Sequence, residues 1–327
     1  MHDLIVIGGG PAAIGAAVYA GRKKLKALLI ADAIGGQSIV SDKIENWIGE
    51  IAISGFELAE KLEKHLRTQK SVEIKIPEKV LKIEAINCIN ENNDSTKHKR
   101  VCDFAVTTNK NSSYSAKAVI VASGARRKRL GILGEDKFDG KGVAFCSTCD
   151  APIFAGKDVA VVGGGNAGLE AVADLFPYAD KIYLLVRGDA LKGDAVTQEE
   201  VKKNSKTEIL FNTIPKEIFG EQFVLGLKYI NTKTNEEKTL NIGGVFVEIG
   251  SVPNSEMVRG LVDINQYGEI VIDHRTCATS HTGIFAAGDV TDELYKQNNI
   301  SVGEGIIAAL SAYNYILQRQ KQIPASS

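Results

Sequence analysis

Two cysteines three positions apart, followed at once by an acid, are the residues in this chain best suited to chemistry. Cys146 and Cys149 enclose Ser147 and Thr148, and Asp150 comes next. A Cys-x-x-Cys pair among alternating strands and helices is typical of a redox couple, which cycles between a disulfide and a dithiol. The carboxylate of Asp150 is a candidate to carry protons to and from the sulfurs.

A metal site is the competing interpretation of these cysteines. Half of a zinc site would need a second close pair, whereas Cys88, Cys102 and Cys277 stand apart in the sequence. The five histidines show no ligand spacing either. We therefore expect no metal and, because the cysteine count is odd with one close pair, no structural disulfide framework.

Two glycine-rich loops lie on either side of the redox pair. Residues 8–13 read Gly-Gly-Gly-Pro-Ala-Ala, and residues 163–168 read Gly-Gly-Gly-Asn-Ala-Gly. Each loop follows a short apolar run and precedes a helical pattern, the context in which such a loop binds the pyrophosphate of a dinucleotide. Asp32 follows the next strand and is placed to bind ribose hydroxyls. A dithiol between two such loops suggests that electrons pass from one dinucleotide to another and on to sulfur.

Short apolar runs bounded by glycine predict buried strands of parallel sheets. They occupy residues 4–7, 27–30, 118–122, 158–162, 181–186, 243–249 and 284–287. Helices are expected over 14–24 and 169–176 and from 301 onward, and Ser54 with Glu57 predicts a capping box before another helix. In the last helix one face carries Ile306, Leu310, Tyr313 and Leu317. Residues 209–240 resemble an antiparallel meander and 269–273 a short strand, so the chain as a whole is expected to be an α/β protein.

Composition excludes several classes of protein. A length of 327 residues suggests about two domains, and a net charge of −1 gives no basic surface for nucleic acid. No run of about 18 apolar residues predicts a membrane span, and no signal peptide precedes the first strand. The cytoplasm is therefore the expected location. The basic run 126–129 is expected to be a solvated surface.

The order and spacing of these motifs resemble one family. Together with Gly35-Gly36-Gln37, Ile44 to Trp47 and Ala-Ala-Gly-Asp at 286–289, they make the chain look like a low-molecular-weight thioredoxin reductase. It is also similar to the C-terminal module of the alkyl hydroperoxide reductase flavoprotein. The resemblance implies two Rossmann-like three-layer ββα nucleotide-binding domains, one inserted in the other. Residues 1–121 and 250–327 would form a discontinuous FAD-binding domain, and 122–249 the NAD(P)H-binding domain with the redox pair. It also implies a homodimer that reduces thioredoxin or a thioredoxin-like protein.

The same resemblance assigns residues to the two cofactors. FAD would be bound by Gly8, Gly10, Pro11, Ala12, Asp32, Gly36, Gln37, Asn46, Asp289 and Gln297. The pyridine nucleotide would be bound by Gly163, Gly165, Asn166, Ala167, Arg187 and Lys192. Cys149 would face the flavin, Cys146 would attack the partner's disulfide, and Asp150 would act as general acid and base. The inserted domain would rotate about hinges near residues 123–124 and 250–251.

The electron donor is the point at which the chain departs from the family. The usual NADPH-dependent pattern is His-Arg-Arg with a further arginine four residues later. This chain keeps Arg187 but has Gly188 and Lys192 in place of the other two arginines. A 2′-phosphate favours arginine, whereas NADH favours an acid at the strand end, where Val186 stands. We therefore expect NADPH with reduced affinity.

Other interpretations share these motifs. NADH or reduced ferredoxin are alternative donors, and a peroxiredoxin system is an alternative acceptor. A non-catalytic flavoprotein that senses redox state is the hypothesis from another class; sustained disulfide turnover with a thioredoxin-like protein would separate it from an enzyme.

Overall fold

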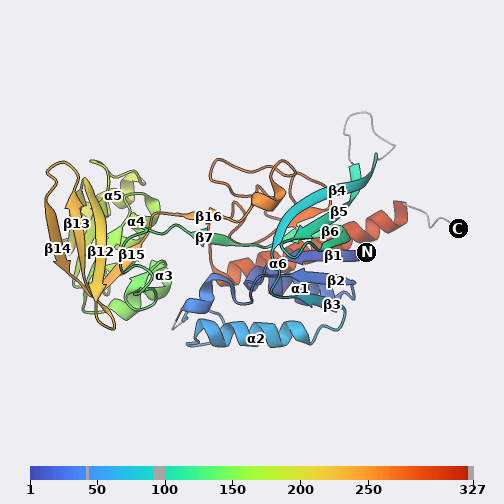
Figure 1. Ribbon diagram of the computed structural model, residues 1–327, viewed down its shortest axis with the longest axis horizontal. Helices are drawn as coiled ribbons and strands as arrows, with labels where there is room; N and C mark the ends of the chain where they lie inside the picture. The colour runs from blue at the N-terminus through green and yellow to red at the C-terminus, as the bar shows by residue number, and fades with distance from the viewer. Residues whose placement is uncertain (42–43, 91–99, 323–327) are drawn as a thin grey trace. The chain divides into compact units, whose positions relative to one another are not determined.

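The computed structural model describes residues 1–41, 44–90 and 100–322. The chain divides into two compact units, and Figure 1 labels many of their elements. Unit 1 comprises Met1–Ser41, Trp47–Arg126 and Val252–Ser327, and unit 2 comprises Asp42–Asn46 and Arg127–Ser251. The main boundaries thus fall at 126/127 and 251/252, where the sequence predicted 121/122 and 249/250.

Unit 1 is built on one mixed sheet with strand order β3-β2-β1-β6-β5-β4, and β17 pairs with β6 outside this path. Its strands are β1 (His2–Ile7), β2 (Ala27–Ile30), β3 (Val72–Lys75), β4 (Val80–Asn90), β5 (Arg100–Thr108), β6 (Ser113–Val121) and β17 (Ile284–Ala286). β1, β2, β3, β6 and β17 run parallel, whereas β4, β5 and β6 pair antiparallel. The carboxyl ends of the parallel strands therefore meet at one edge, where ligands bind in such sheets.

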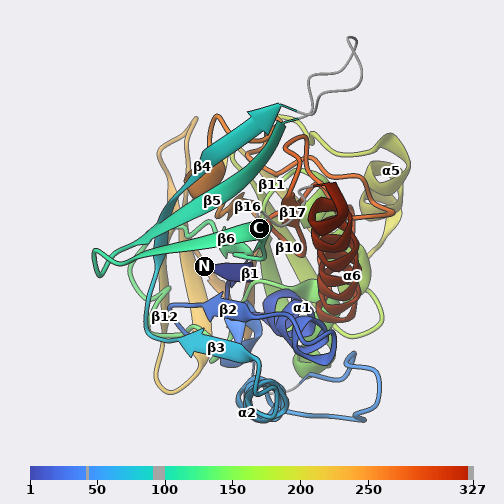
Figure 2. The same ribbon diagram turned by 90° about the vertical axis from the view of Figure 1, so that its right-hand side faces the viewer.

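Three α-helices accompany this sheet. They are α1 (Pro11–Arg22), α2 (Gly55–Arg67), which has the expected capping box of Ser54 and Glu57, and α6 (Asn298–Gln322). Figure 2 shows α6 beside α1. By length and composition alone α6 could cross a membrane. The core helix of a globular protein passes the same test, and α6 packs on α1, β6 and β17.

The contact between α1 and α6 is made by small residues. A Cβ atom added to Gly305 would lie 2.1 Å from the carbonyl oxygen of Ala12, and Ala308 and Ala312 are fully buried. The backbones thus approach too closely for large side chains to fit between them. Of the four apolar residues that the sequence places on one face of α6, Tyr313 packs against the core, whereas Leu317 is 38% exposed.

Unit 2 has three layers. The central parallel sheet has the order β11-β10-β9-β15-β8, formed by β8 (Val143–Ala144), β9 (Asp158–Val162), β10 (Lys181–Val186), β11 (Thr207–Phe211) and β15 (Gly244–Val247). Helices α4 (Asn166–Leu175) and α5 (Ala195–Lys203) pack on the face that contains Val159 and Val161. The antiparallel sheet of β12 (Thr213–Gly220), β13 (Val224–Asn231) and β14 (Glu237–Asn241) packs on the face that contains Ala160 and Val162. This is the ββα arrangement that the resemblance implied.

Two expectations about individual elements are wrong, and one helix was not expected. β11 pairs in parallel with β10, so the meander begins at β12 and not at residue 209, because an apolar pattern identifies a strand but not its partner. Residues 269–273 make only isolated bridges, which join Ile270 to Ile264 and Thr291 and join Asp273 to Ala278. α5 has no counterpart among the expected elements, since Val201 is its one buried residue and its periodic signal is weak.

A second disulfide joins Cys88 on β4 to Cys102 on β5, which the sequence placed apart. Antiparallel pairing with an irregular register between Ile86 and Ile89 brings their Cα atoms to 4.1 Å. Cys277 is the free cysteine among the described residues, and burial raises the pKa of its thiol to about 12. The Cys277 thiol is therefore unreactive at neutral pH.

The two units are connected by two short paired strands, β7 (Ala125–Arg127) and β16 (Ser251–Pro253). Gly124 precedes β7 with φ of +65° and Gly250 precedes β16 with φ of +93°. These are left-handed conformations that favour glycine. Both connections thus contain a residue with unusual backbone freedom.

The basic run at the first connection is exposed at Arg126, Lys128 and Arg129, as expected of a solvated surface, and two of its arginines also make local contacts. Arg126 forms an ion pair of 2.7 Å with Glu256 in unit 1. Within unit 2, Arg129 lies over the ring of Phe145, 4.7 Å from its centre, and pairs with Asp139. The arginines hold local structure in place.

Substituting Gly305 tests the close contact of α1 and α6. Gly305→Ala should lower the free energy of unfolding by about 1–3 kcal/mol, because its methyl group overlaps the Ala12 carbonyl. Gly303→Ala is the matched control: no atom lies within 4 Å of its added Cβ, and alanine should stabilise the helix by up to about 1 kcal/mol. Urea unfolding of the two variants decides this, and equal stability would contradict the packing described.

Candidate functional site

The redox pair lies in unit 2 on a one-turn helix. α3 (Ser147–Asp150) starts directly after Cys146, and Cys146 and Cys149 form a disulfide with 5.4 Å between their Cα atoms. The N–H of Asp150 donates to the Cys146 carbonyl at 3.0 Å, which closes the turn. Both cysteines are half-buried. The disulfide that the sequence predicted is therefore present and can accept two electrons to become a dithiol.

Two acids outside the motif hold this turn. Asp174 on α4 accepts hydrogen bonds from the hydroxyls of Ser147 at 2.8 Å and Thr148 at 3.2 Å. Glu248 lies two residues beyond the Phe246–Ala144 pair of the parallel strands β15 and β8, which places it beside Cys146 and Ser147, and its carboxyl interacts with the backbone N–H of Ser147. Sequence reasoning missed both, because they lie far from the cysteines along the chain. The one usable signal was an acid directly after a buried parallel strand, which is the position of Glu248.

The second glycine loop of the chain, residues 163–168, lies in unit 2 and is shaped for a phosphate group. Gly163 has φ of +144°, and a Cβ there would lie 2.2 Å from the carbonyl oxygen of Glu248. α4 begins at Gly165 with no side-chain cap, whereas α5 is capped by Asp194. A Cβ on Gly165 would meet no atom within 4 Å. The start of α4 is thus uncapped and open at Gly165, as binding of a pyrophosphate requires.

Asn166 and Ala167, also predicted to bind the nucleotide, form the first turn of α4. The side-chain oxygen of Asn166 accepts the Asp194 N–H at 2.7 Å. Asn166 therefore fixes the loop before α5 against the glycine loop.

The two cations predicted to select the nucleotide lie beyond the end of β10. Arg187 follows Val186 directly, and the Lys192 N–H donates to the Gly164 carbonyl at 2.8 Å, which brings residues 187–192 against the glycine loop. Both side chains are exposed. Within the described ranges neither forms an ion pair or a side-chain hydrogen bond. Two uncommitted cations beside a dinucleotide loop fit an anionic group on the ribose.

The first glycine loop in unit 1 repeats this design. Gly8 has φ of +126°, and a Cβ there would lie 2.1 Å from the Ala122 carbonyl oxygen. α1 begins at Gly10 without a side-chain cap and with Pro11 in its first turn. Gly36 has φ of +62°, and its Cβ would lie 3.0 Å from the Gly10 Cα. The loop therefore fits a second dinucleotide, and Gly8, Gly10, Pro11, Ala12 and Gly36 come together as expected.

Asp289 connects this loop region to α6. It lies just after β17 and accepts hydrogen bonds from the side-chain amide of Gln37 and the hydroxyl of Ser301, both at 3.3 Å. The N–H of Gly288 donates to the Glu304 carboxylate at 2.6 Å. Burial raises the pKa of Glu304 to about 7, although the Gly288 N–H opposes this shift. Gln37 and Asp289, predicted separately, thus belong to one hydrogen-bonded group.

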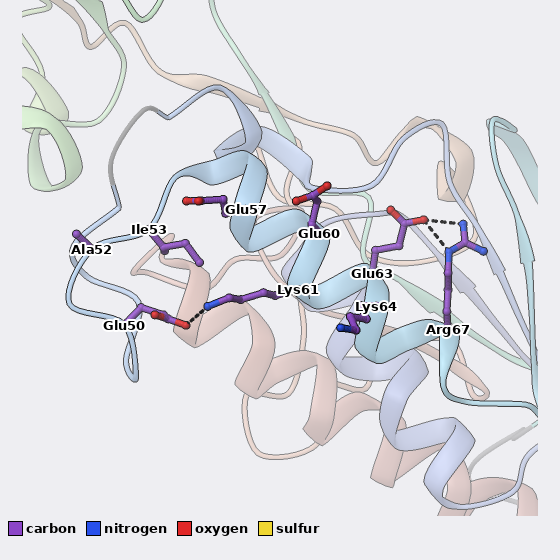
Figure 3. A pocket seen from close by; sticks show the side chains of 9 residues that line it. All are labelled: Glu50, Ala52, Ile53, Glu57, Glu60, Lys61, Glu63, Lys64 and Arg67. Carbon is purple, nitrogen blue, oxygen red and sulfur yellow. Dashed lines mark hydrogen bonds and ion pairs between the residues drawn. The ribbon is translucent and has the colours of Figure 1, made fainter.

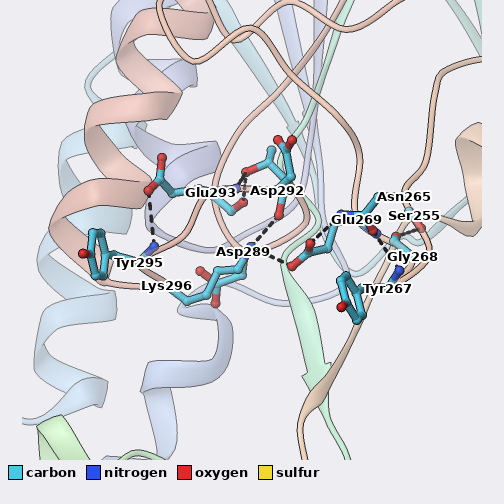
Figure 4. A network of polar contacts seen from close by, with 12 residues as sticks. Ser255, Asn265, Tyr267, Gly268, Glu269, Asp289, Asp292, Glu293, Tyr295 and Lys296 are labelled. Carbon is cyan, nitrogen blue, oxygen red and sulfur yellow. Dashed lines mark hydrogen bonds and ion pairs between the residues drawn. The ribbon is translucent and has the colours of Figure 1, made fainter. Parts of the chain in front are cut away.

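Polar contacts fix the segment around Asp289, as Figure 4 shows. Lys296 forms an ion pair of 3.2 Å with Glu269 and donates to the Thr291 carbonyl. The Asp292 carboxylate accepts the N–H of Ile272 at 3.1 Å. The loop that follows Asp289 is therefore held by contacts to Glu269 and Ile272 and by a contact within the loop itself.

For the remaining predicted residues, Asp32, Gln297 and Asn46, the structure gives a position in the fold. Asp32 is exposed two residues after β2, at the carboxyl edge of the sheet. Gln297 directly precedes α6. Asn46, expected with the FAD residues of unit 1, is grouped with unit 2. For Asn46 a role toward the same cofactor stays a prediction.

A cavity of about 720 Å³ lies elsewhere in unit 1, along the charged face of α2 (Figure 3). Its lining includes Glu57, Glu60 and Lys64 and two ion pairs, Lys61 with Glu50 and Arg67 with Glu63. None of the predicted site residues lines it. We assign the chemistry to the glycine loops and the redox turn, which are shaped for it.

The fold also brings together a group that sequence spacing did not suggest. His274, Glu293 and Glu304 place ligand atoms within 4.8 Å of one another. Glu304 is already bonded to the Gly288 N–H, and the Lys296 charge also acts on it. We interpret the group as part of the polar network of this loop.

Comparisons with known proteins agree with this geometry. The pattern of the pyridine nucleotide-disulphide oxidoreductase family matches residues 2–305. A solved thioredoxin reductase from Streptococcus pyogenes MGAS5005 is 35% identical, with a TM-score of 0.86 over 97% of this chain and 99% of that one. Thioredoxin reductase from Giardia duodenalis is 30% identical, with a TM-score of 0.85 and the same coverage.

Curated relatives are longer. "NADH dehydrogenase" of Bacillus subtilis is 38% identical over 316 residues, and an alkyl hydroperoxide reductase protein of Staphylococcus epidermidis is 39% identical over 317. Each alignment covers 97% of this chain but 59% of the relative, so the chain spans about three fifths of their length. The family match, the two glycine loops and the disulfide lead to one conclusion: the chain belongs to the pyridine nucleotide-disulphide oxidoreductase family.

Proposed function

We propose that this protein is an NADPH-dependent, FAD-containing reductase that reduces the disulfide of thioredoxin or a thioredoxin-like protein. One observation carries the proposal: the half-buried Cys146–Cys149 disulfide shares a unit with an uncapped glycine loop. The two exposed cations Arg187 and Lys192 next to that loop support NADPH as the donor. FAD, when bound to unit 1, supplies the ability to pass two electrons between a nicotinamide and a disulfide.

The chain's own residues then carry out thiol–disulfide exchange. The Cys146 thiolate attacks one sulfur of the partner's disulfide, which forms a mixed disulfide and releases the first partner thiolate. The Cys149 thiolate then attacks the Cys146 sulfur of the mixed disulfide. This restores the Cys146–Cys149 bond and releases the second thiolate of the partner. Two electrons thus leave the dithiol, and two protons join the partner's sulfurs. Asp150, bonded to the Cys146 carbonyl through its N–H, is the candidate to supply the protons.

Two further parts of the proposal concern assembly and motion. The redox pair and the second glycine loop belong to unit 2, whereas the first loop belongs to unit 1. We propose that unit 2 reorients about Gly124 and Gly250, whose positive φ values mark the two connections. A homodimer is proposed on the family resemblance.

A second candidate is an NADH-linked reductase in a peroxiredoxin system. The names of the relatives at 38% and 39% identity favour it. So does the loss of the second arginine at Gly188, which weakens selection for a 2′-phosphate. Reduced ferredoxin is the third candidate donor, and it is compared with NADPH and NADH in the experiment below.

Flavin analysis and anaerobic titration test the proposal directly. Acid precipitation should release FAD and not FMN, because the first loop is built for a dinucleotide. NADPH should then bleach the flavin absorbance more effectively than NADH, with reduced ferredoxin titrated in parallel. Recovery of FMN, or bleaching by ferredoxin alone, would contradict the proposal.

Serine variants separate the roles of the two sulfurs. Cys146→Ser and Cys149→Ser should both abolish disulfide turnover but leave flavin reduction intact. Cys149→Ser alone should accumulate a mixed disulfide with oxidised thioredoxin, because Cys146 can attack and nothing resolves the product. Asp150→Asn should slow turnover by roughly 10-fold or more, whereas Cys277→Ser should not. Trapping by Cys146→Ser instead would reverse the assignment.

Arg187→Ala tests the choice of nucleotide. The Michaelis constant for NADPH should rise by about 10-fold, since one charge-assisted contact to phosphate is lost, and that for NADH by less than about twofold. Lys203→Ala, which removes an exposed cation of α5 paired to Glu199, is the matched control. Steady-state kinetics with both nucleotides measure this, and equal losses for the two would refute the role of Arg187.

A further inference from the structure

Glu248 occupies a position at which the fold itself needs no side chain. It follows β15, its N–H donates to the Val162 carbonyl at 2.9 Å, and its carbonyl oxygen packs on Gly163. Unit 1 has the same arrangement after β6: the Ala122 N–H donates to Ile7 at 2.8 Å, and its carbonyl packs on Gly8. Alanine occupies this position in unit 1, so the packing of the glycine loop does not require the carboxyl group of Glu248 in unit 2.

The Glu248 carboxyl is directed at the redox turn. β15 and β8 pair in parallel, Val245 with Val143 and Phe246 with Ala144, so Glu248 lies beside Cys146 two residues further on, and its carboxyl interacts with the backbone N–H of Ser147. The hydroxyls of Ser147 and Thr148 bind Asp174 from the neighbouring helix. Asp174 therefore holds the side chains of both residues between the cysteines, and Glu248 is the carboxyl that lies beside the backbone next to Cys146.

The charges around Glu248 come from three elements. Arg127 of β7 is the cation, and Asp174 of α4 and Asp150 of α3 are the acids. Burial is the largest influence and raises the pKa of Glu248 to about 8; Arg127 opposes the rise, and the two acids add to it. The carboxyl therefore holds a proton at neutral pH and becomes an anion in the range in which thiols ionise.

We propose that Glu248 is a positioning residue that holds the Cys146–Cys149 turn and, by gaining or losing its own proton, controls how readily Cys146 becomes a thiolate. Neutral Glu248 adds no charge beside the thiolate. Ionised Glu248 places a like charge beside it, and the two groups then titrate as a coupled pair. The inference deepens the proposed function, because it rests on Cys146 acting as the attacking thiolate.

Alkylation of a single sulfur tests the proposal without a donor or a partner protein. In the flavin-loaded, reduced Cys149→Ser protein, the iodoacetamide reaction of Cys146 is followed by mass spectrometry of its peptide from about pH 6 to about pH 10. With Glu248 present, the rate should rise in two steps. With Glu248→Gln, it should follow a single titration and be about 3- to 10-fold faster near pH 9, since one pKa unit is tenfold in thiolate.

Two controls accompany this test. Glu208→Gln removes an exposed carboxylate of β11, paired to Lys181 at 2.7 Å in the same unit, and should leave the two-step profile unchanged. Glu248→Ala, chosen to match Ala122 of unit 1, should give the same single titration as Glu248→Gln. It replaces Glu248→Gln in the test if the glutamine variant does not fold. Superimposable profiles with and without the Glu248 carboxyl would overturn the proposal.

Stability gives an independent readout. An acid whose pKa is raised on folding binds more protons in the folded state, so stability falls as pH rises from the unfolded pKa near 4.5 to the folded value of about 8. Glu248→Gln should therefore be more stable than the parent at about pH 8, and this advantage should disappear at about pH 4. An altered alkylation profile in a protein that no donor reduces would uphold the inference and refute the proposed function.

Discussion

The structure depends on one steric constraint that occurs twice: a glycine α-carbon pressed against the carbonyl oxygen at the end of a neighbouring parallel strand. In unit 1, Gly8 packs on Ala122, and in unit 2, Gly163 packs on Glu248. A side chain at either glycine would overlap that oxygen at 2.1 or 2.2 Å, well inside ordinary contact. The constraint sets where each following helix begins, and so directs its free N–H groups toward a ligand.

Helix capping separates the ligand-facing helices from the structural ones. α1 and α4, which follow the glycine loops, start without a capping side chain. α2 and α5 start with Ser54 and Asp194 as caps. A cap fills the hydrogen-bonding capacity that an anion would otherwise use, so the two kinds of helix start cannot be exchanged without loss of binding or of stability.

Much of this could be predicted from the sequence where the signal is local. The strands at 27–30, 158–162 and 181–186 have the expected bounds, because short apolar runs end at turn residues or loops. The redox pair, the glycine loops and the Ser54–Glu57 capping box are local in the same sense. Their identification needed no knowledge of the fold.

The errors arise where tertiary contacts decide the outcome. β11 is a strand as expected, but its partner is β10 and not the meander. α6 meets α1 at Gly305, a residue that the apolar pattern of α6 does not mark. Cys88 and Cys102 meet through an irregular strand register, and Asp174 and Glu248 reach the redox turn from other elements. Such contacts follow from the three-dimensional arrangement alone.

Because unit 1 is built from the two ends of the chain, the two units can fold at different times during synthesis. β17 and α6 come from the end of the chain, yet they pair with β6 and pack on α1, which come from its beginning. Unit 2 lies between them and has its own sheet and core. During synthesis the inserted unit can therefore close while unit 1 still lacks a strand and a helix. Until α6 has been synthesised and released from the ribosome, the nascent chain exposes the apolar surface of unit 1 that α6 later covers.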